Sequence, residues 1–170
     1  LREDKSSAKR ADIIVVTKCP DNLSQKDKQL FLTSLNPLEK QKVFFSSLTY
    51  LQKIKSESEE IDIDVLKDDN FILVTGIADS SYLVNFLKLK GLDFKHLKYS
   101  DHYNFKKSSV DKISELSLNK KILTTEKDFG RLSPKVKNRD IFYIEVGLKF
   151  PKEINDLDFN TYIEEYINKD

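Results

Sequence analysis

Two kinds of segment alternate along this chain. Short runs of β-branched and aromatic residues, such as Phe71-Ile72-Leu73-Val74-Thr75, are separated by segments whose apolar residues recur at helical spacing. The runs are nearly continuous in apolar residues, which is typical of strands that helices cover on both faces. The alternation therefore predicts an α/β fold with a mostly parallel sheet and flanking helices. We expect strands at residues 13–17, 43–45, 71–75 and 141–146, and a shorter one at 121–124.

Local signals place helices between these strands. Ser24 and Asp27 have the spacing of a capping box, and Pro37 is expected to end the helix that follows. A second helix is expected from about residue 79 to 90, with Gly91 as its C-terminal cap, and a third around Ile113. The last helix has apolar residues at i, i+3, i+4, i+7 and i+8, namely Phe159, Tyr162, Ile163, Tyr166 and Ile167.

The size and charge of the chain limit the classes it can belong to. Its 170 residues are about the length of one domain, and 39% of them are hydrophobic, so we expect a single α/β domain over residues 1–170. The formal net charge of +1 gives no overall attraction to nucleic acid. No run approaches the roughly 18 apolar residues of a membrane span, so the chain is expected to be soluble. The one cysteine, Cys19, excludes an intrachain disulfide framework and favours a reducing compartment.

An acidic stretch occupies residues 53–70. Its seven carboxylates and its short alternating portion around Ile63 predict an exposed connection or an edge hairpin. A metal site of clustered carboxylates is the alternative, but the spacing matches no EF-hand loop and the stretch has no glycine. The acidic residues are Glu57, Glu59, Glu60, Asp62, Asp64, Asp68 and Asp69.

Polar residues follow several of the predicted strands at the edge where open α/β sheets bind ligands. Two of these groups are Thr17-Lys18 after the first strand and Gly76-Ile77-Ala78-Asp79 after the third. A third is Thr124-Thr125-Glu126-Lys127-Asp128 after the strand at 121–124. Arg2-Glu3 near the start of the chain is a fourth group, and Asp101-His102 lies in a further polar and aromatic segment. These five groups are the candidates for a functional site.

Each group has a structural and a functional interpretation. A carboxylate beside an imidazole sets its tautomer and raises its basicity, so Asp101-His102 suits catalysis, yet Asp before a helix is usually a cap. Thr125 and Asp128 have the spacing of reciprocal caps, and Arg131 three residues on suits a pair on the helix surface. The other histidine, His96, lies in an alternating segment and is interpreted as a surface strand residue.

The chain carries no known phosphate-binding loop. Among its four glycines there is neither a G-x-x-x-x-G-K-[ST] nor a G-x-G-x-x-G pattern. Its first residue is Leu1 rather than Met, and the opening Leu-Arg-Glu-Asp-Lys is typical of the middle of a gene product. We therefore expect a fragment of a longer protein.

Five short motifs, in their order along the chain, resemble the C-terminal half of the tetraacyldisaccharide 4′-kinase family, the lipid A 4′-kinases of Gram-negative bacteria. The motifs are Leu1-Arg2-Glu3, Arg10-Ala11-Asp12 running into Val16-Thr17-Lys18, Gly76-Ile77-Ala78, Asp101-His102 with Phe105, and Thr124-Thr125-Glu126-Lys127-Asp128 with Arg131-Leu132.

The resemblance implies a fold and an activity. The fold would be the C-terminal part of a P-loop-kinase-like fold without its P-loop half. Members of the family transfer the γ-phosphoryl group of ATP to the 4′-hydroxyl of tetraacyldisaccharide 1-phosphate, using Mg²⁺, at the cytoplasmic face of the inner membrane. The phosphate-binding loop and the membrane anchor lie upstream of a position like Leu1, so this chain alone would be inactive.

The resemblance also assigns roles to residues. Asp101 and His102 would line the catalytic cleft, with His102 supporting an upstream aspartate as the base, and Lys127 would contribute directly. Arg2 and Glu3 would lie near the phosphates, with Glu3 at the metal. Thr17 and Lys18 follow a hydrophobic strand, as base-recognition segments of nucleotide-binding proteins do. The candidate nucleotide-binding residues are therefore Arg2, Glu3, Thr17 and Lys18.

The sequence departs from the family pattern at three points. Tyr103 replaces a second histidine after Asp-His, Asp4 replaces a proline, and Asp79-Ser80 stands where a proline usually follows, which predicts a helix cap there. Two other functions are considered beside the kinase. One is a stand-alone, non-catalytic α/β module that binds a nucleotide or a protein, and the other is a purely structural domain.

Overall fold

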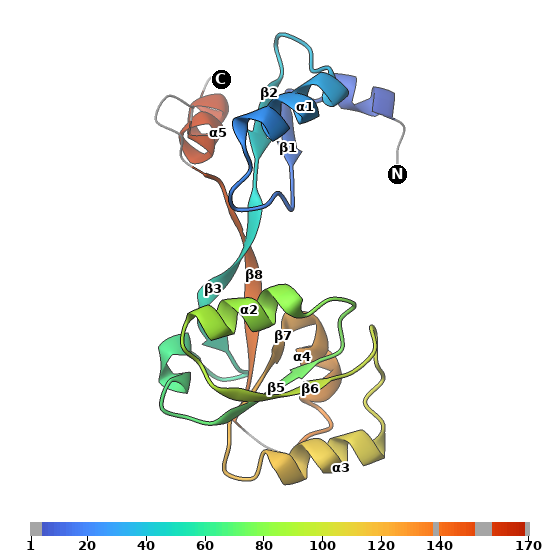
Figure 1. Cartoon of the computed structure of the whole chain (residues 1–170), viewed down its shortest axis with the longest axis vertical. Coiled ribbons are helices and arrows are strands. Elements are labelled where there is room, and N and C mark those ends of the chain that lie inside the picture. Colours follow the sequence, from blue (N-terminus) through green and yellow to red (C-terminus); the bar gives the residue numbers. More distant parts are fainter. Residues whose placement is uncertain (1–4, 138–139, 152–157, 169–170) are drawn as a thin grey trace. The chain divides into compact units, whose positions relative to one another are not determined.

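The structure, a computed structural model, describes residues 5–137, 140–151 and 158–168. The chain divides into two compact units, one formed by residues 1–49 and 147–170 and the other by residues 50–146. The length of the chain predicts one domain over residues 1–170. The division into two compact units does not test whether they fold as one domain, so this stays a prediction. Both units are drawn in Figure 1.

The first unit contains a pair of parallel strands and two helices. The strands β1 (Ile13–Val16) and β2 (Lys42–Phe45) pair in parallel, and α1 (Gln25–Leu35) connects them after the short 3₁₀ helix η1 (Lys5–Arg10). The hydroxyl of Ser24 accepts from the amide of Asp27 and caps α1, as its spacing predicts. The last helix, α5 (Phe159–Ile167), packs the ring of Phe159 edge-on against Phe44, with 5.0 Å between the ring centroids.

The second unit is built around a six-stranded sheet with the order β4-β3-β8-β7-β5-β6. The strand β5 pairs in parallel with β6 and β7, β7 pairs in parallel with β8, and β3 pairs antiparallel with β4 at one edge. A mostly parallel sheet with flanking helices confirms the predicted α/β class. The strands are β3 (Ser47–Lys55), β4 (Glu60–Asp62), β5 (Phe71–Thr75), β6 (Phe94–Lys98), β7 (Ile122–Thr125) and β8 (Ile141–Lys149). The first three residues of β3 and the last three of β8 fall within the bounds of the first unit.

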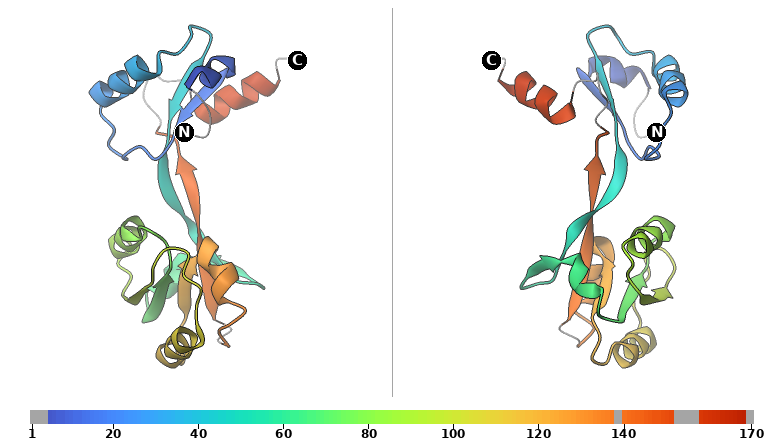
Figure 2. Two further views of the ribbon diagram at one scale, coloured as in Figure 1. Left: turned by 90° about the vertical axis from the view of Figure 1, so that its right-hand side faces the viewer. Right: turned by 60° about the vertical axis from the view of Figure 1, so that its left-hand side comes forward.

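Helices cover both faces of this sheet (Figure 2). Alternate residues of β5 enter two separate cores: Leu73 packs with Leu83 and Leu87 of α2, whereas Val74 packs with Ile113 of α3 and Leu132 of α4. This division follows from the alternation of side chains along a strand. The helices are α2 (Ser81–Leu89), α3 (Lys107–Leu116) and α4 (Glu126–Leu132), and a 3₁₀ turn, η2 (Ile63–Leu66), precedes β5.

The acidic stretch at 53–70 contains an edge hairpin, the second of the two predicted alternatives, because β3 and β4 pair antiparallel at the edge of the sheet. It contains the end of β3, the edge strand β4 and η2, and the side chains of Ile54, Ile63 and Leu66 are fully buried in the core beside α2. These three apolar side chains are buried although charged residues surround them in the sequence, because they point into the core. The carboxylates themselves are exposed, apart from the half-buried Asp69.

Candidate functional site

The candidate site lies at the carboxyl ends of β5, β6 and β7. Gly76 directly follows β5, a turn at residues 99–103 follows β6, and α4 begins immediately after β7. Because these strands are parallel neighbours, the three segments meet at one edge of the sheet. Their meeting brings together residues from motifs that lie 50 residues apart in the sequence.

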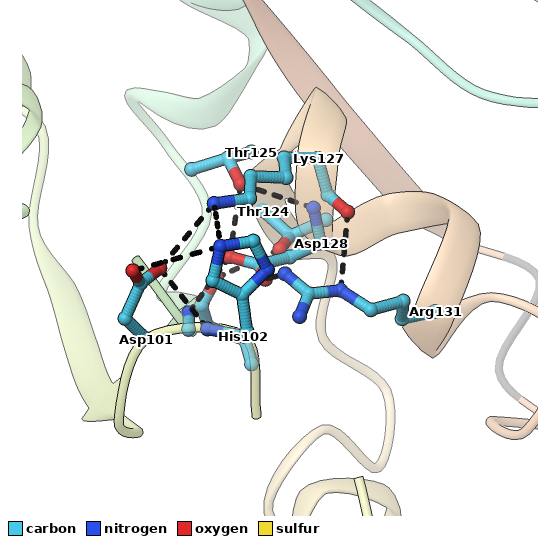
Figure 3. A network of polar contacts seen from close by, with 9 residues as sticks. Asp101, His102, Thr124, Thr125, Lys127, Asp128 and Arg131 are labelled. Carbon is cyan, nitrogen blue, oxygen red and sulfur yellow. Dashed lines mark hydrogen bonds and ion pairs between the residues drawn. The ribbon is translucent and has the colours of Figure 1, made fainter. Parts of the chain in front are cut away.

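Asp101, His102 and Lys127 contact one another at this edge (Figure 3). The ammonium of Lys127 lies 3.3 Å from Oδ1 of Asp101 and 3.1 Å from Nε2 of His102. The same Nε2 is 3.7 Å from Oδ2 of Asp101. All three side chains are exposed, with 48% of Lys127, 40% of Asp101 and 70% of His102 accessible, so they are open to a ligand.

The turn that carries Asp101 and His102 is held by the end of β5. The amide of Tyr99 donates to the carbonyl of Thr75, and the amide of His102 donates to the carbonyl of Gly76. His102 adopts a positive φ of 55°, a conformation that non-glycine residues seldom adopt outside tight turns. The alternative in which Asp101 caps a helix is wrong, because α3 begins only at Lys107 and the carboxylate of Asp101 accepts from the amide of His102.

The charges around Asp101 favour its ionised form. Partial burial opposes ionisation, but the hydrogen bond from Lys127, the electrostatic interactions with His102 and Lys127, and the amide of His102 together lower the pKa of Asp101 below its ordinary value. A carboxylate at this position therefore stays charged and keeps the Lys127 ammonium in place. The contact between Asp101 and Lys127 is exposed, so it orients the side chains more than it stabilises the fold.

The Thr125-x-x-Asp128 spacing forms a helix cap, as predicted, with one addition. The hydroxyl of Thr125 accepts from the amide of Asp128 at 3.2 Å and donates to the Asp128 carboxylate at 2.9 Å. That carboxylate is fully buried, and it also accepts from the amide of Gly76 at 2.7 Å and from Arg131 at 2.5 Å. The cap thus connects α4 to the end of β5, a contact that sequence reasoning missed.

Tyr103, which replaces the second histidine of the family pattern, is part of the packing. Its hydroxyl lies 2.8 Å from the hydroxyl of Ser109, and its ring stacks on Tyr99 with 4.7 Å between centroids. Both contacts hold the turn against the start of α3. The ring of Tyr103 therefore packs against the turn, and its hydroxyl is hydrogen-bonded to Ser109.

His96 differs from the surface strand residue that the alternation predicted. It lies on β6 and is half-buried, and its Nε2 is 2.8 Å from the hydroxyl of the fully buried Thr75. Burial, with a smaller effect of the charge of Lys98, lowers the pKa of His96. A neutral His96 ring forms a hydrogen bond with the Thr75 hydroxyl at the end of β5.

The predicted nucleotide-binding residues lie elsewhere in the chain. Thr17 and Lys18 follow β1 in the first unit, where both are exposed and Lys18 has a φ of 61°. Arg2 and Glu3 lie outside the described residues. Within the described ranges no three His, Cys, Asp or Glu side chains gather as metal ligands, and no helix is long and apolar enough to cross a membrane.

Comparisons with known proteins agree with the motifs. Residues 1–165 match the family model described as tetraacyldisaccharide-1-P 4'-kinase. The chain is 35% identical, over 98% of its length, to the tetraacyldisaccharide 4'-kinase of Flavobacterium psychrophilum, and 31% identical, over 99% of its length, to that of Flavobacterium johnsoniae. It covers 48% of each of these proteins, so the chain spans about half the length of the curated relatives it matches.

The fold also resembles a solved structure. The crystal structure of LpxK from Aquifex aeolicus in complex with ATP matches with a TM-score of 0.56 and 21% identity. The match covers 90% of this chain and 42% of that protein. At 21% identity, this structural similarity supports the fold of the chain and carries no conclusion about its function.

Proposed function

The chain belongs to the tetraacyldisaccharide-1-P 4'-kinase family, and from this premise we propose that it forms about half of an enzyme that phosphorylates a lipid. The complete protein would transfer the γ-phosphoryl group of ATP to the 4′-hydroxyl of tetraacyldisaccharide 1-phosphate. It would work at the cytoplasmic face of the bacterial inner membrane, where an acylated disaccharide is presented. This chain would supply one wall of the catalytic cleft.

The contact between Lys127 and the Asp101-His102 pair carries this proposal. His102 and Lys127 are 25 residues apart, one in the turn after β6 and the other on the first turn of α4, yet their polar groups meet at the carboxyl ends of parallel strands. Both also belong to the motifs in which the sequence resembles the family. The helix cap at Thr125 and Asp128 does not involve the Lys127 side chain, so the cap does not account for its contacts with Asp101 and His102.

The three side chains suit phosphoryl transfer, in which positioning and charge stabilisation outweigh covalent chemistry. An ammonium group has three N–H donors. Lys127 directs two of them to Asp101 and His102, which leaves the third for an oxygen of the transferred phosphoryl group. The His102 imidazole would support proton removal from the sugar hydroxyl, and the ionised Asp101 would keep Lys127 and His102 together.

The nucleotide and the metal would be bound mainly by other residues. ATP would be contacted by Thr17, Lys18, Arg2 and Glu3, and Mg²⁺ would be held at Glu3. Bound Mg²⁺ neutralises charge on the phosphate oxygens. The described residues do not fit a complete metal site, since Asp101 is engaged with Lys127 and no three ligands gather there, so we assign no step to a metal that they hold.

The test uses the full-length protein that contains this chain, with ATP, Mg²⁺ and tetraacyldisaccharide 1-phosphate. We expect 4′-phosphorylated product, and we expect Lys127→Ala to lower kcat by about 10²-fold or more, as loss of a group that stabilises transition-state charge does. Lys67→Ala is the matched control, because Lys67 is an equally exposed lysine paired with Asp64 in the same unit. Nucleotide binding without transfer would favour the non-catalytic module instead.

A further inference from the structure

Gly76 is hydrogen-bonded to both sides of the candidate site. Its amide donates to Oδ2 of Asp128 at 2.7 Å, and its carbonyl accepts from the amide of His102 at 3.0 Å. Asp128 is the neighbour of Lys127 on the first turn of α4. One residue at the end of β5 thus connects the helix that carries Lys127 to the turn that carries His102.

Asp128 has more partners than a helix cap needs. A buried carboxylate is costly unless donors satisfy it, and Asp128, which is fully buried, accepts from Gly76, Thr125 and Arg131. The cap of α1 provides a comparison within the same chain, because Ser24 and Asp27 have the same spacing. There Asp27 is exposed and its carboxylate accepts from Ser24 within the same turn.

The space around Gly76 shows how closely these segments approach. A Cβ atom at residue 76 would lie 3.0 Å from Oδ1 of Asp128, and 3.5 Å from both the carbonyl oxygen of Ser100 and the Cβ of Tyr103. The tightest of these contacts is the one to Asp128. The absence of a side chain at residue 76 therefore lets the buried carboxylate reach the end of β5.

We propose that Asp128 is a positioning residue that, through Gly76, sets the distance between the Lys127 ammonium and the His102 imidazole. Removal of its carboxylate frees the first turn of α4 from the end of β5 while the His102 turn stays bonded to the carbonyl of Gly76. Lys127 then loses its fixed place beside Nε2. The kinetic consequence rests on the proposed kinase function, whereas the structural consequence does not.

The ¹⁵N chemical shift of His102 Nε2 reports whether the contact with Lys127 is formed, because it changes when the nitrogen gains or loses a hydrogen bond. It is measured in the full-length protein at one fixed pH, and the His102→Gln variant assigns the signal. We expect Asp128→Ala to move the shift in the same direction as Lys127→Ala. Asp62→Ala, which removes the aspartate that caps η2 in the same unit, is the matched control and should leave the shift in place.

A Nε2 shift that stays unchanged in Asp128→Ala, together with a lowered melting temperature, would overturn the proposal and leave Asp128 as a stabilising cap. If Asp128→Ala does not fold, Gly76→Ala replaces it, since its Cβ would press on the Asp128 carboxylate, and an unchanged shift there overturns the proposal equally. The variant that combines Gly76→Ala with Asp128→Ala should change the Nε2 chemical shift no more than Asp128→Ala alone, because the new Cβ at residue 76 then meets no carboxylate.

Kinetics separate this proposal from the proposed function. If the full-length protein is a kinase, Asp128→Ala should lower kcat by roughly 10- to 100-fold, as small misplacements of catalytic groups do, with a smaller change in KM for ATP. An unaltered protein that forms no product refutes the kinase function, and the comparison of Nε2 shifts still decides the positioning role.

Discussion

Nε2 of His102 lies 3.1 Å from the ammonium nitrogen of Lys127. An ammonium group offers only hydrogens, so Nε2 accepts this hydrogen bond. The neutral imidazole then carries its hydrogen on Nδ1. The contact thus selects one of the two tautomers of His102 and leaves Nδ1 as its remaining donor.

The two histidines are expected to have separate roles. His102→Ala should lower kcat by about 10²- to 10⁴-fold, the range for loss of a group that assists proton transfer, and should change KM for ATP much less. His96→Ala should leave kcat within about twofold but lower the free energy of unfolding by about 1 to 3 kcal/mol, because the buried hydroxyl of Thr75 loses its partner. Steady-state kinetics and denaturant unfolding check the pair.

A change in KM in place of kcat would contradict the role given to His102. If His102→Ala raises KM for the lipid and leaves kcat intact, His102 binds substrate and does not assist proton transfer.

Asp101 is expected to titrate below its ordinary value of 3.8. Its ionised form is favoured in the folded protein, so its contribution to stability is complete above pH 3.8 and disappears as the pH falls through the lower folded pKa. Lys127→Ala removes the hydrogen bond and the charge and should raise the pKa of Asp101. Carboxyl ¹³C NMR measures both titrations, and identical midpoints would show that Lys127 has no influence on Asp101.

Tyr50 should make the protein sensitive to alkali. Burial first, and then the charges of Tyr82 and Asp79, raise the pKa of Tyr50 to about 12 from 10.0. The unfolded chain loses the proton near pH 10 whereas the folded protein keeps it, so stability falls between pH 10 and 12. Tyr50→Phe should shift the alkaline unfolding transition, followed by circular dichroism, to higher pH. An unshifted transition would assign alkaline unfolding to other groups.

Residues 1–170 alone are expected to show no kinase activity. They contain no phosphate-binding loop of a known pattern, and positioning of the phosphates is the main requirement of the reaction. The assay is incubation of the purified chain with ATP, Mg²⁺ and the disaccharide lipid. Product above background would refute the interpretation as half an enzyme and would require a phosphate site among these residues.

The sequence predicted those elements whose signals are local. A few residues are enough to recognise the continuous apolar run of β5 and the cap residues Ser24 and Thr125. The structure has all three in the expected places. The strand β3 was missed because polar and apolar residues mix along it without strict alternation. The burial of Ile63 was missed for a related reason, since carboxylates dominate its neighbourhood in the sequence.

Contacts between distant segments were beyond sequence reasoning. The hydrogen bond from Gly76 to Asp128 joins residues 52 apart, and it exists because two parallel strands place their ends side by side. The motifs identified Asp101, His102 and Lys127 as candidates but gave no sign that these side chains touch. Register between strands decides such contacts, and one sequence carries little information about register.

The order of the two units along the chain has a consequence for biosynthesis. The unit that carries His102 and Lys127 is one uninterrupted stretch that is complete once residue 146 has been synthesised, whereas the other unit needs residues 147–170 as well as residues 1–49. The whole sheet unit is therefore synthesised before α5, whose Phe159 packs against Phe44 of β2. Until α5 follows, Phe44 lacks this ring contact, so the first unit can complete its packing only after the sheet unit has been made.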